Sequence, residues 1–305
     1  MRSVKLPSVS VVIPAYRARS QLRECLSALR RQTLRDREVI VVDSSEQPES
    51  SRALEAAFPE VVFDHVGARL GPQAARTRGA RHAQGRIIAF TDSDCRPRSD
   101  WLAQLTAARD PDDAWLIGGR IVPAEQGWLQ RGMHVCKFPT SIGDRARGRL
   151  RALPTANAAL SRTAWNCVGP FRVSGWAGDT ELVWRAEATG VPLHYLPDAV
   201  VEHRQQTAFG GFLLERVERG RAFASMRSAA EEWSRARTLA WVVAMPLVPM
   251  LMSLRLVRHA ARTGWLGEAV KTFPVHLTGF TAWTVGEATS HVKRLLSPSS
   301  SAVAR

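Results

Sequence analysis

The chain has 305 residues, of which 45% are hydrophobic and 23% charged, a composition that excludes a protein disordered over most of its length. Its formal net charge of +14 would suit phosphate-rich substrates, an anionic membrane surface or nucleic acid, although a general bias toward arginine would give the same total. The arginines are scattered rather than interleaved with aromatic residues, so we expect no nucleic-acid partner.

Four cysteines, Cys25, Cys95, Cys136 and Cys167, lie far apart without any CxxC or Cys/His spacing. This spacing argues against a zinc site and a disulfide framework, and it fits a reducing compartment. Residues 1–7 are followed by no apolar run before the first strand signal, so we expect no signal peptide and a cytoplasmic catalytic part.

From residue 8 to residue 91, short β-branched runs alternate with segments of helical periodicity. We predict strands at 8–13, 39–42, 61–64 and 87–91, and helices at 20–32, 49–57 and 73–83. This alternation predicts an α/β fold with a mostly parallel sheet flanked by helices. Ligands of such sheets bind outside the carboxyl ends of the strands. The candidate positions are therefore Pro14, Ala15 and Tyr16, then Asp43, Ser44 and Ser45, then Asp92, Ser93 and Asp94.

The second part of the chain has a less regular pattern. We predict a strand at 115–122, a mobile connection at 123–153, a helix at 179–189, strands at 191–196 and 200–202, and a charged closing helix at 213–232. The connection carries Arg145, Arg147, Arg149 and Arg151, which could order over a diphosphate or form a solvated face.

Two apolar stretches follow, at 239–254 and 273–285. As a helix the first would be about 24 Å long, shorter than the ~30 Å hydrocarbon core of a bilayer, and Pro246 and Pro249 would kink it. Flanking arginines suit anionic lipids but assign no direction. We therefore predict a catalytic domain at 1–235 and a membrane-associated helical region at 236–305 that lies on the membrane or re-enters it, with a short disordered tail from residue 297. A buried core helix of a second subdomain is the alternative.

The most informative residues are Asp92 and Asp94, which end the apolar strand IIAFT. Two carboxylates one residue apart can hold a divalent cation, Mg²⁺ or Mn²⁺, through oxygen ligands, and the cation could bind a diphosphate. An acidic turn without a function is the alternative for this DxD motif alone. Neither GxGxxG nor GxxxxGK[ST] is present, so a nucleotide would have to bind in another way.

Several segments resemble those of the family-2 glycosyltransferases with the GT-A (Rossmann-like) fold, over about residues 8–223. VSVVIPAY and VIVVDSS are similar to the family's first two strands, and GPQAARTRGARHAQGRIIAFTDSD to the helix that leads into the DxD strand. TANAALSR looks like the acceptor-side segment, GWAGDTELVWRA like the segment with the catalytic base, and VVEHR places a histidine after a strand. Thr77 and Gly178 stand where the family usually has asparagine and glutamate.

The resemblance implies a role for each matching residue. The donor-binding residues would be Pro14, Ala15, Tyr16, Asp43, Arg76 and Asp92; the acceptor-binding residues Asn157, Trp176 and Arg185; the metal ligands Asp92, Asp94 and His203; and the general base Asp179. Each has a plainer alternative: Asp43 and Asp179 could cap local turns or helices, His203 could be structural, and Trp165, Trp176 and Trp184 could pack in the core instead of forming a wall for a sugar or lipid.

Sugar transfer from a nucleotide donor needs residues that bind a cation and a residue that acts as a general base. Displacing a nucleoside diphosphate builds negative charge that a cation must neutralise, and the attacking hydroxyl must lose its proton to a base. We expect a hexosyltransferase-like enzyme that transfers a sugar, with inversion, from a nucleotide-sugar donor to a membrane-held or lipid-linked acceptor at the cytoplasmic face of the membrane, in polysaccharide or glycolipid biosynthesis. A non-catalytic nucleotide-sugar-binding protein is one alternative. A nucleotidyltransferase is another, although it would normally carry a glycine-rich signature near its first strand.

Overall fold

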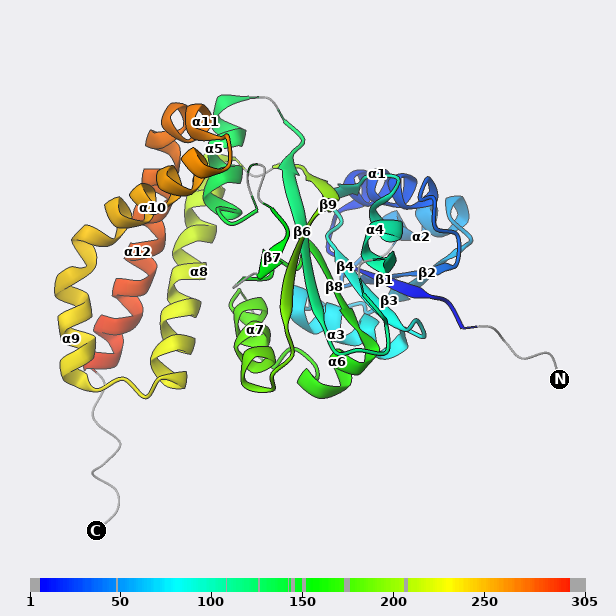
Figure 1. The fold of residues 1–305 in the computed structure, drawn as a ribbon, viewed down its shortest axis with the longest axis horizontal. Helices are drawn as coiled ribbons and strands as arrows, with labels where there is room; N and C mark the ends of the chain where they lie inside the picture. The colour runs from blue at the N-terminus through cyan, green and yellow to red at the C-terminus, as the bar shows by residue number, and fades with distance from the viewer. Residues whose placement is uncertain are drawn as a thin grey trace, which may run out of the picture. The chain divides into compact units, whose positions relative to one another are not determined.

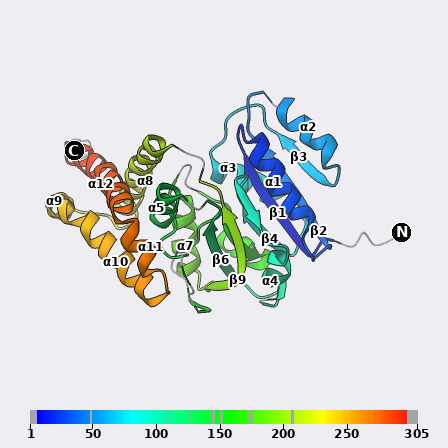
Figure 2. The same ribbon diagram turned by 90° about the horizontal axis from the view of Figure 1, so that it is seen from above.

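The computed structural model describes residues 6–47, 49–107, 109–125, 127–141, 143, 146–149, 152–172, 176–205 and 208–296 (Figures 1 and 2). Arg145, Arg151 and the predicted tail lie outside these residues. The chain forms two compact units, which we call unit 1 (Met1–Glu125 with Thr140–Gln205) and unit 2 (Gln126–Pro139 with Gln206–Arg305). The division at residue 235 that we expect between a catalytic domain and a membrane-associated region stays a prediction.

The first half of unit 1 is a regular parallel β/α arrangement. Strands β1 (Val9–Ala15), β2 (Arg37–Asp43), β3 (Val61–His65) and β4 (Ile87–Thr91) alternate along the chain with helices α1 (Arg19–Arg30), α2 (Glu49–Ala57) and α3 (Pro72–His82). The strands lie in the order β3-β2-β1-β4, and all these neighbours are parallel. The predicted elements of this half are confirmed, because alternating hydrophobic periods encode them locally.

The second half continues the sheet with strands from distant parts of the chain. Its strands are β5 (Cys95–Pro97), β6 (Leu116–Pro123), β7 (Gly148–Arg149), β8 (Asn157–Ser161) and β9 (Leu193–His203), and its helices are α4 (Trp101–Ala107), α6 (Arg162–Val168) and α7 (Gly178–Ala188). Beyond β4 the order is β8-β6-β9-β5, with β7 also on β9. Strand β8 is antiparallel to both of its neighbours, and β9 is parallel to β6. The predicted α/β fold with a central sheet between helices is confirmed (Figure 1), and its second half mixes strand directions.

Two details of the prediction are wrong. The two strands expected at 191–196 and 200–202 are one strand, β9, because β9 accommodates the three residues 197–199 as an irregularity opposite the step from Gly119 to Arg120 and then pairs with β6 again. The mobile connection expected at 123–153 contains a helix, α5 (Trp128–Lys137), which belongs to unit 2.

The core of unit 1 lies between the sheet and its helices. Phe90 of β4 packs against Trp165 and Phe171, so Trp165 is a core residue, as its plainer alternative has it. Helix α7 adds Leu182 and Val183 to the same cluster. Residues at the carboxyl ends of the strands are thus carried on a rigid base.

Unit 2 is a set of packed helices. They are α5, α8 (Phe209–Ala230), α9 (Arg235–Ala244), a short 3₁₀ turn η1 (Met245–Leu247), α10 (Val248–Arg262), α11 (Leu266–Lys271) and α12 (Phe273–Leu296). The predicted closing helix corresponds to α8. Helices α8 and α12 approach so closely that a Cβ on Gly220 would lie 2.0 Å from the carbonyl oxygen of Trp283, and one on Gly286 2.0 Å from that of Val217.

The two apolar stretches have different surroundings. Much of α12 is buried against its neighbours, including Val275 and Phe280. By contrast, Arg235–Arg262 is long and apolar enough to cross a membrane by length and composition, and only 22% of its apolar window is buried.

Candidate active site

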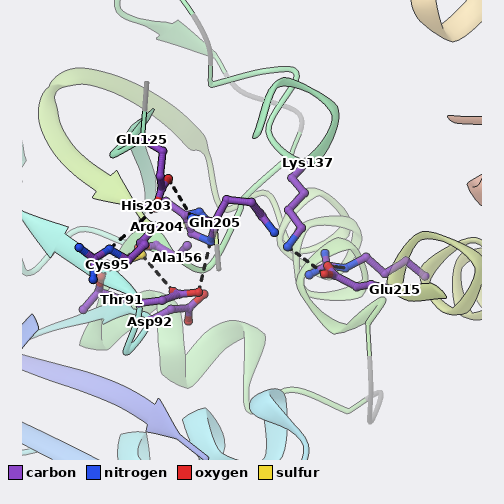
Figure 3. Close-up of polar contacts among 12 residues, drawn as sticks. Thr91, Asp92, Cys95, Glu125, Lys137, Ala156, His203, Arg204, Gln205 and Glu215 are labelled. Atoms are coloured by element: carbon purple, nitrogen blue, oxygen red, sulfur yellow. Dashed lines mark hydrogen bonds and ion pairs between the residues drawn. The ribbon is translucent and has the colours of Figure 1, made fainter. Parts of the chain in front are cut away.

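The DxD residues follow the fully buried strand β4. The chain turns sharply there, because the carbonyl oxygen of Asp92 accepts a hydrogen bond of 3.0 Å from the amide of Cys95, the first residue of β5. Strand β5 pairs antiparallel with the end of β9, where Cys95 lies opposite His203. As a result, Nε2 of His203 lies 3.5 Å from Oδ2 of Asp94. Figure 3 labels His203 and Cys95 at this turn, with Asp92 nearby. The His203 side chain is 6% exposed and that of Asp94 36%, so the pair lies at the edge of solvent.

The end of β9 is fastened to this turn. The amide of Arg204 donates a 3.0 Å hydrogen bond to the carbonyl oxygen of Asp94, and the Arg204 guanidinium pairs with Glu24 of α1 at 2.9 Å. The amide of Gln205 donates to a carboxylate oxygen of Glu125. The histidine and the DxD turn are therefore held together by backbone contacts as well as by side chains.

Helix α3 supplies a buried cation to Asp92. Arg76 donates a hydrogen bond from Nη2 to Oδ1 of Asp92, and its side chain is buried. Gln73 and Thr77 lie on the same helix face at i, i+3 and i+4 spacing with Arg76. Within the described residues, Oε1 of Gln73, Nε of Arg76 and Oγ1 of Thr77 are buried and make no hydrogen bond. Such orphaned buried polar atoms are uncommon in proteins, and a polar ligand is one explanation for them.

The thiols beneath the DxD turn are neutral. Cys25 and Cys95 are fully buried, and burial, followed by the nearby charges of Asp94 and Asp92, raises the pKa of both thiols far above neutrality. Cys95 lies 3.7 Å from Oδ1 of Asp94 as a weak S–H donor. The candidate ligands that the structure places at this turn are the carboxylate oxygens of Asp92 and Asp94 and the imidazole of His203.

Asp43 organises the loop after β2. Its Oδ1 accepts hydrogen bonds from the amide of Ser45 at 3.0 Å and from Oγ of Ser45 at 2.6 Å, while its Oδ2 lies 3.5 Å from Nδ1 of His65. The carboxylate is almost completely buried. The structure therefore shows Asp43 capping the turn after β2, which is the plainer of its two predicted roles. Its contact with the nucleotide base of a donor stays a prediction.

The loops after β1 and β2 are joined. Pro14 and Ala15 end β1 beside Val42 and Asp43, and the carbonyl oxygen of Ala15 accepts from the amide of Ser44 at 2.9 Å.

Next to them the Tyr16 ring has two guanidinium groups over it, from Arg17 at 5.2 Å and Arg69 at 4.8 Å, and its hydroxyl donates to Glu46. Arg17 has a left-handed backbone (φ 50°), and its amide donates to Oγ of Ser45. The Tyr16 ring thus has two guanidinium groups close to it, and one of them, that of Arg17, is also paired with Glu46 at 3.2 Å.

Asn157 lies inside the sheet. Its Oδ1 accepts from the indole N–H of Trp101 at 2.9 Å, and its Nδ2 donates to the carbonyl oxygens of Arg120 and Ala199, both at 2.8 Å. The side chain is 0% exposed. Asn157 thus joins β8 to β6, β9 and α4, and a direct contact with an acceptor would require these bonds to open.

Asp179 is in the first turn of α7, where its Oδ1 accepts from the amide of Thr180 at 2.9 Å. Arg185 on the same helix donates to the carbonyl oxygen of Pro170 and pairs with Glu181, each at 2.9 Å. These contacts fasten α7 to the segment after α6. Trp176 precedes the helix and is partly exposed.

Comparison with known proteins decides the family. The model of glycosyl transferase family 2 matches residues 10–168, which is more than half of the chain and includes both DxD aspartates. The chain belongs to glycosyl transferase family 2.

Two curated relatives are similar over much of this glycosyltransferase. Glycosyltransferase AglE of Haloferax volcanii is 27% identical over 224 residues, 71% of this chain and 73% of AglE. The pre-mycofactocin glycosyltransferase of Mycobacterium tuberculosis is 29% identical over 65% of this chain, which spans only 43% of that relative. Among solved structures, the mannosyltransferase PcManGT of Pyrobaculum calidifontis superposes with a TM-score of 0.62 at 19% sequence identity. The alignment covers 95% of this chain and 88% of the PcManGT chain. The GT-A fold that the sequence resemblance implies is confirmed.

In this family-2 glycosyltransferase the structure brings together Asp92, Asp94, His203 and Arg76. Sequence reasoning missed four further polar residues around the donor-side loops, namely Arg17, His65, Arg69 and Gln73. Arg17, directly after Tyr16, and His65, directly after the strand predicted at 61–64, had a positional signal; Arg69 and Gln73 are placed by tertiary contacts.

Proposed function

We propose that this enzyme transfers a sugar from a nucleoside-diphosphate donor to a hydroxyl of a membrane-held or lipid-linked acceptor, by a single displacement with inversion. The observation that carries the proposal is the Asp94–His203 pair at 3.5 Å beside the Arg76–Asp92 ion pair. It combines ligands for a cation with a fixed positive charge at one end of the sheet.

The residues present fit a divalent cation. Within the described residues no three His, Cys, Asp or Glu side chains form a ready metal cluster. Mg²⁺, however, is commonly held by one or two carboxylates together with substrate phosphates and water, so Asp94, His203 and Asp92 form a sufficient protein donor set. Two structural neighbours were solved with Mn²⁺, PcManGT together with GDP-Man and GalNAc-T7 together with UDP and GalNAc. A cation bound by these residues would neutralise negative charge on the leaving diphosphate.

The chain's own residues would hold the donor. Arg76 lies against Asp92 with its Nε unsatisfied, and Gln73 and Thr77 offer further buried polar atoms. The joined loops at Pro14, Ala15, Tyr16 and Asp43 would receive the nucleoside, with the aromatic ring of Tyr16 as a stacking surface.

Asp179 is our proposed general base. Asp179 lies in the N-terminal turn of α7, and its carboxylate would accept the proton of the attacking hydroxyl. On the acceptor side, Trp176 offers an aromatic face, while Arg185 and Asn157 would act by holding α7 and β8 in place.

Contact with the membrane would come from helices α9 and α10. Leu239, Val243, Leu247, Met250, Leu251 and Leu254 are exposed and follow one another at helical spacing along one face. Arg237 and Arg255 flank this face, as suits anionic headgroups. We propose that this face lies on the cytoplasmic surface of the membrane. The name of a further relative, succinoglycan biosynthesis protein ExoM of Rhizobium meliloti, supports a role in polysaccharide biosynthesis.

The base is tested with Asp179→Asn. After a panel of UDP- and GDP-sugars has been screened by thermal stabilisation, release of nucleoside diphosphate is measured with a membrane lipid extract as acceptor. We expect turnover to fall about 10²- to 10⁴-fold at unchanged donor affinity. The matched control is Asp112→Asn, whose carboxylate is exposed and pairs with Arg86. Wild-type turnover in a folded Asp179→Asn protein would disprove the assignment.

The metal is tested by nucleotide binding with Mn²⁺ or in chelator. We expect Mn²⁺ to tighten binding of UDP or GDP to the wild type, and Asp94→Asn and His203→Gln to abolish most of this gain while leaving binding in chelator unchanged. Equal affinity with and without metal in the wild type would contradict the proposed site.

A further inference from the structure

The chain beyond the end of strand β9 is held by individual contacts. His203 is the last residue of β9 and lies opposite Cys95 of β5 and Pro123 of β6. Arg204 and Gln205 follow the strand, beyond the last paired residue. Because no ladder of strand hydrogen bonds continues here, the positions of these two residues depend on the contacts that each of them makes.

Arg204 contacts three separate parts of unit 1. Its amide donates a hydrogen bond of 3.0 Å to the carbonyl oxygen of Asp94. Its Nη1 donates to Oε1 of Glu24 on α1 at 2.9 Å, and its Nε lies 3.8 Å from Oε1 of Glu125, just after β6. Figure 3 labels Arg204 and Glu125 beside His203. One residue thus joins α1, the segment after β6 and the DxD turn.

The two carboxylates that hold this guanidinium are themselves anchored. The second oxygen of Glu125, Oε2, accepts from the amide of Gln205 at 3.0 Å, so Glu125 holds both residues that follow β9. Glu24 also pairs with Arg96 of β5 at 3.6 Å. The residue next to Glu24 on α1, Cys25, is fully buried, so this part of α1 is a fixed base for the contact.

The ion pairs of Arg204 have a larger bearing on local geometry than on overall stability. The side chains of Arg204, Glu24 and Glu125 are 34%, 38% and 25% exposed, and ion pairs as exposed as these contribute little to the stability of a fold. The backbone of Arg204, however, contacts Asp94, whose Oδ2 lies 3.5 Å from Nε2 of His203. A displacement of Arg204 would therefore be transmitted directly to this pair.

We propose that Arg204 is a positioning residue for the DxD turn. Its guanidinium, held by Glu24 and Glu125, fixes its own amide on the carbonyl oxygen of Asp94, and so keeps Asp94 and His203 at the separation that a divalent cation needs. The cation is the part of this inference that rests on the proposed function. Outer contacts that orient the ligands of a metal commonly change its affinity by about 10- to 100-fold when they are lost. A guanidinium cannot bind a cation itself, so Arg204 acts through the two ligands.

The first experiment measures backbone hydrogen exchange of the full chain with chelator present, so its outcome does not depend on the proposed metal. In Arg204→Met we expect several-fold faster exchange of the amide of residue 204 and of the Cys95 amide, which donates to Asp92 in the same turn. The buried strand β1 should exchange as in the wild type. Arg204→Lys can still pair with Glu24 and should restore most of the protection. Wild-type exchange rates at this turn in Arg204→Met would overturn the proposal.

The second experiment titrates Mn²⁺ alone into the full chain and measures the free ion by electron paramagnetic resonance. We expect Arg204→Met to bind Mn²⁺ about ten-fold more weakly than the wild type, with Arg204→Lys between the two. Simple electrostatics predicts the opposite sign, because the loss of a nearby positive charge favours a bound cation. The direction of the change therefore separates positioning from a charge effect, and equal or tighter binding by Arg204→Met would contradict a positioning role.

The matched control is Arg96→Met, which removes a guanidinium of almost the same exposure, 33%, that also pairs with Glu24. Its Mn²⁺ affinity should equal or slightly exceed that of the wild type, and both methionine variants should melt close to the wild-type temperature. An equal loss of Mn²⁺ affinity in the two variants would assign the effect to the charges around Glu24 and overturn the role of Arg204. If the wild type binds no Mn²⁺, the proposed metal site is wrong, and hydrogen exchange alone decides whether Arg204 positions the turn.

Discussion

The two halves of the sheet in unit 1 are built on different principles. In the first half, β1 to β4 are parallel; single crossovers place β2 beside β1 and β3 beside β2, and the chain then returns to place β4 on the other side of β1. In the second half, β8 enters antiparallel between β4 and β6, although about 65 residues of chain separate it from β4, and β9 reaches across to β6, β5 and β7. The first half is thus specified locally, and the second by contacts between distant segments.

The same difference separates the polar residues of the two halves. In the first half, Asp43 ends β2 and Tyr16 follows β1, and each makes hydrogen bonds to residues of the loop after β2. In the second half, Asn157 is inside the sheet and joins three distant segments. The second half therefore depends for its geometry on a few close contacts, and substitutions there should cost more free energy of unfolding.

Gly119→Ala should have the largest effect on stability. A Cβ at this position would lie 2.3 Å from the carbonyl oxygen of Ala199 and 2.4 Å from Nδ2 of Asn157, neither of which can move without breaking the sheet. We expect a loss of about 3 kcal/mol in the free energy of unfolding, measured by denaturant titration.

Two further glycines serve as controls for this comparison. Gly148→Ala has no atom within 4 Å of the new Cβ and should be nearly neutral. Gly79→Ala in the first half meets Cγ1 of Val12 at 2.4 Å, but the obstacle is a side chain, and alanine improves helix propensity by about 1 kcal/mol. An equal loss for Gly79→Ala and Gly119→Ala would remove the contrast between the halves.

Asn157→Ala should come next. It leaves the indole N–H of Trp101 and the carbonyl oxygens of Arg120 and Ala199 without their buried partner, for an expected loss of about 2 to 3 kcal/mol. Because the side chain acts by positioning, nucleotide affinity of the folded protein should remain close to wild type. A variant with full stability but no transfer activity would instead indicate that Asn157 contacts the acceptor directly.

The amount of structure that sequence alone predicts follows the same contrast. Strands β1 to β4 and their helices are visible because β-branched runs alternate with helical periods. The sequence around strand β8 is ANAALS, with small residues in place of β-branched ones. This segment forms a strand because it pairs with β4 on one side and β6 on the other, so tertiary context outweighs its low β-propensity. Strand β5 has only three residues, too short for a period to be visible.

The site divides in a similar way. Asp92 and Asp94 could be named from their place after a strand, whereas Arg76, Asn157 and His203 needed the family resemblance, because their neighbours are far away in sequence. The contact of His65 with Asp43 could have been inferred, because both residues follow neighbouring predicted strands, whereas the contact of Arg69 with Tyr16 had no local signal. The hydrophobic pattern of a sequence indicates which residues follow a strand, but it does not indicate which side chains from other loops contact them.

Ser45→Ala should have the smallest effect and tests whether the loops of the first half are independent of the second. The substitution removes the 2.6 Å hydrogen bond to Asp43 and the acceptor for the amide of Arg17, whose left-handed backbone then loses its support. We expect a loss of about 1 kcal/mol in stability together with a few-fold weaker affinity for the nucleotide. The matched control is Ser44→Ala, because Oγ of Ser44 only adds a second bond to a carbonyl oxygen of Ala15 that already accepts from the backbone. If Ser45→Ala lowers stability without lowering nucleotide affinity, these contacts are only structural and the nucleoside binds elsewhere. If nucleotide affinity falls alone, the contacts of Ser45 shape the donor site.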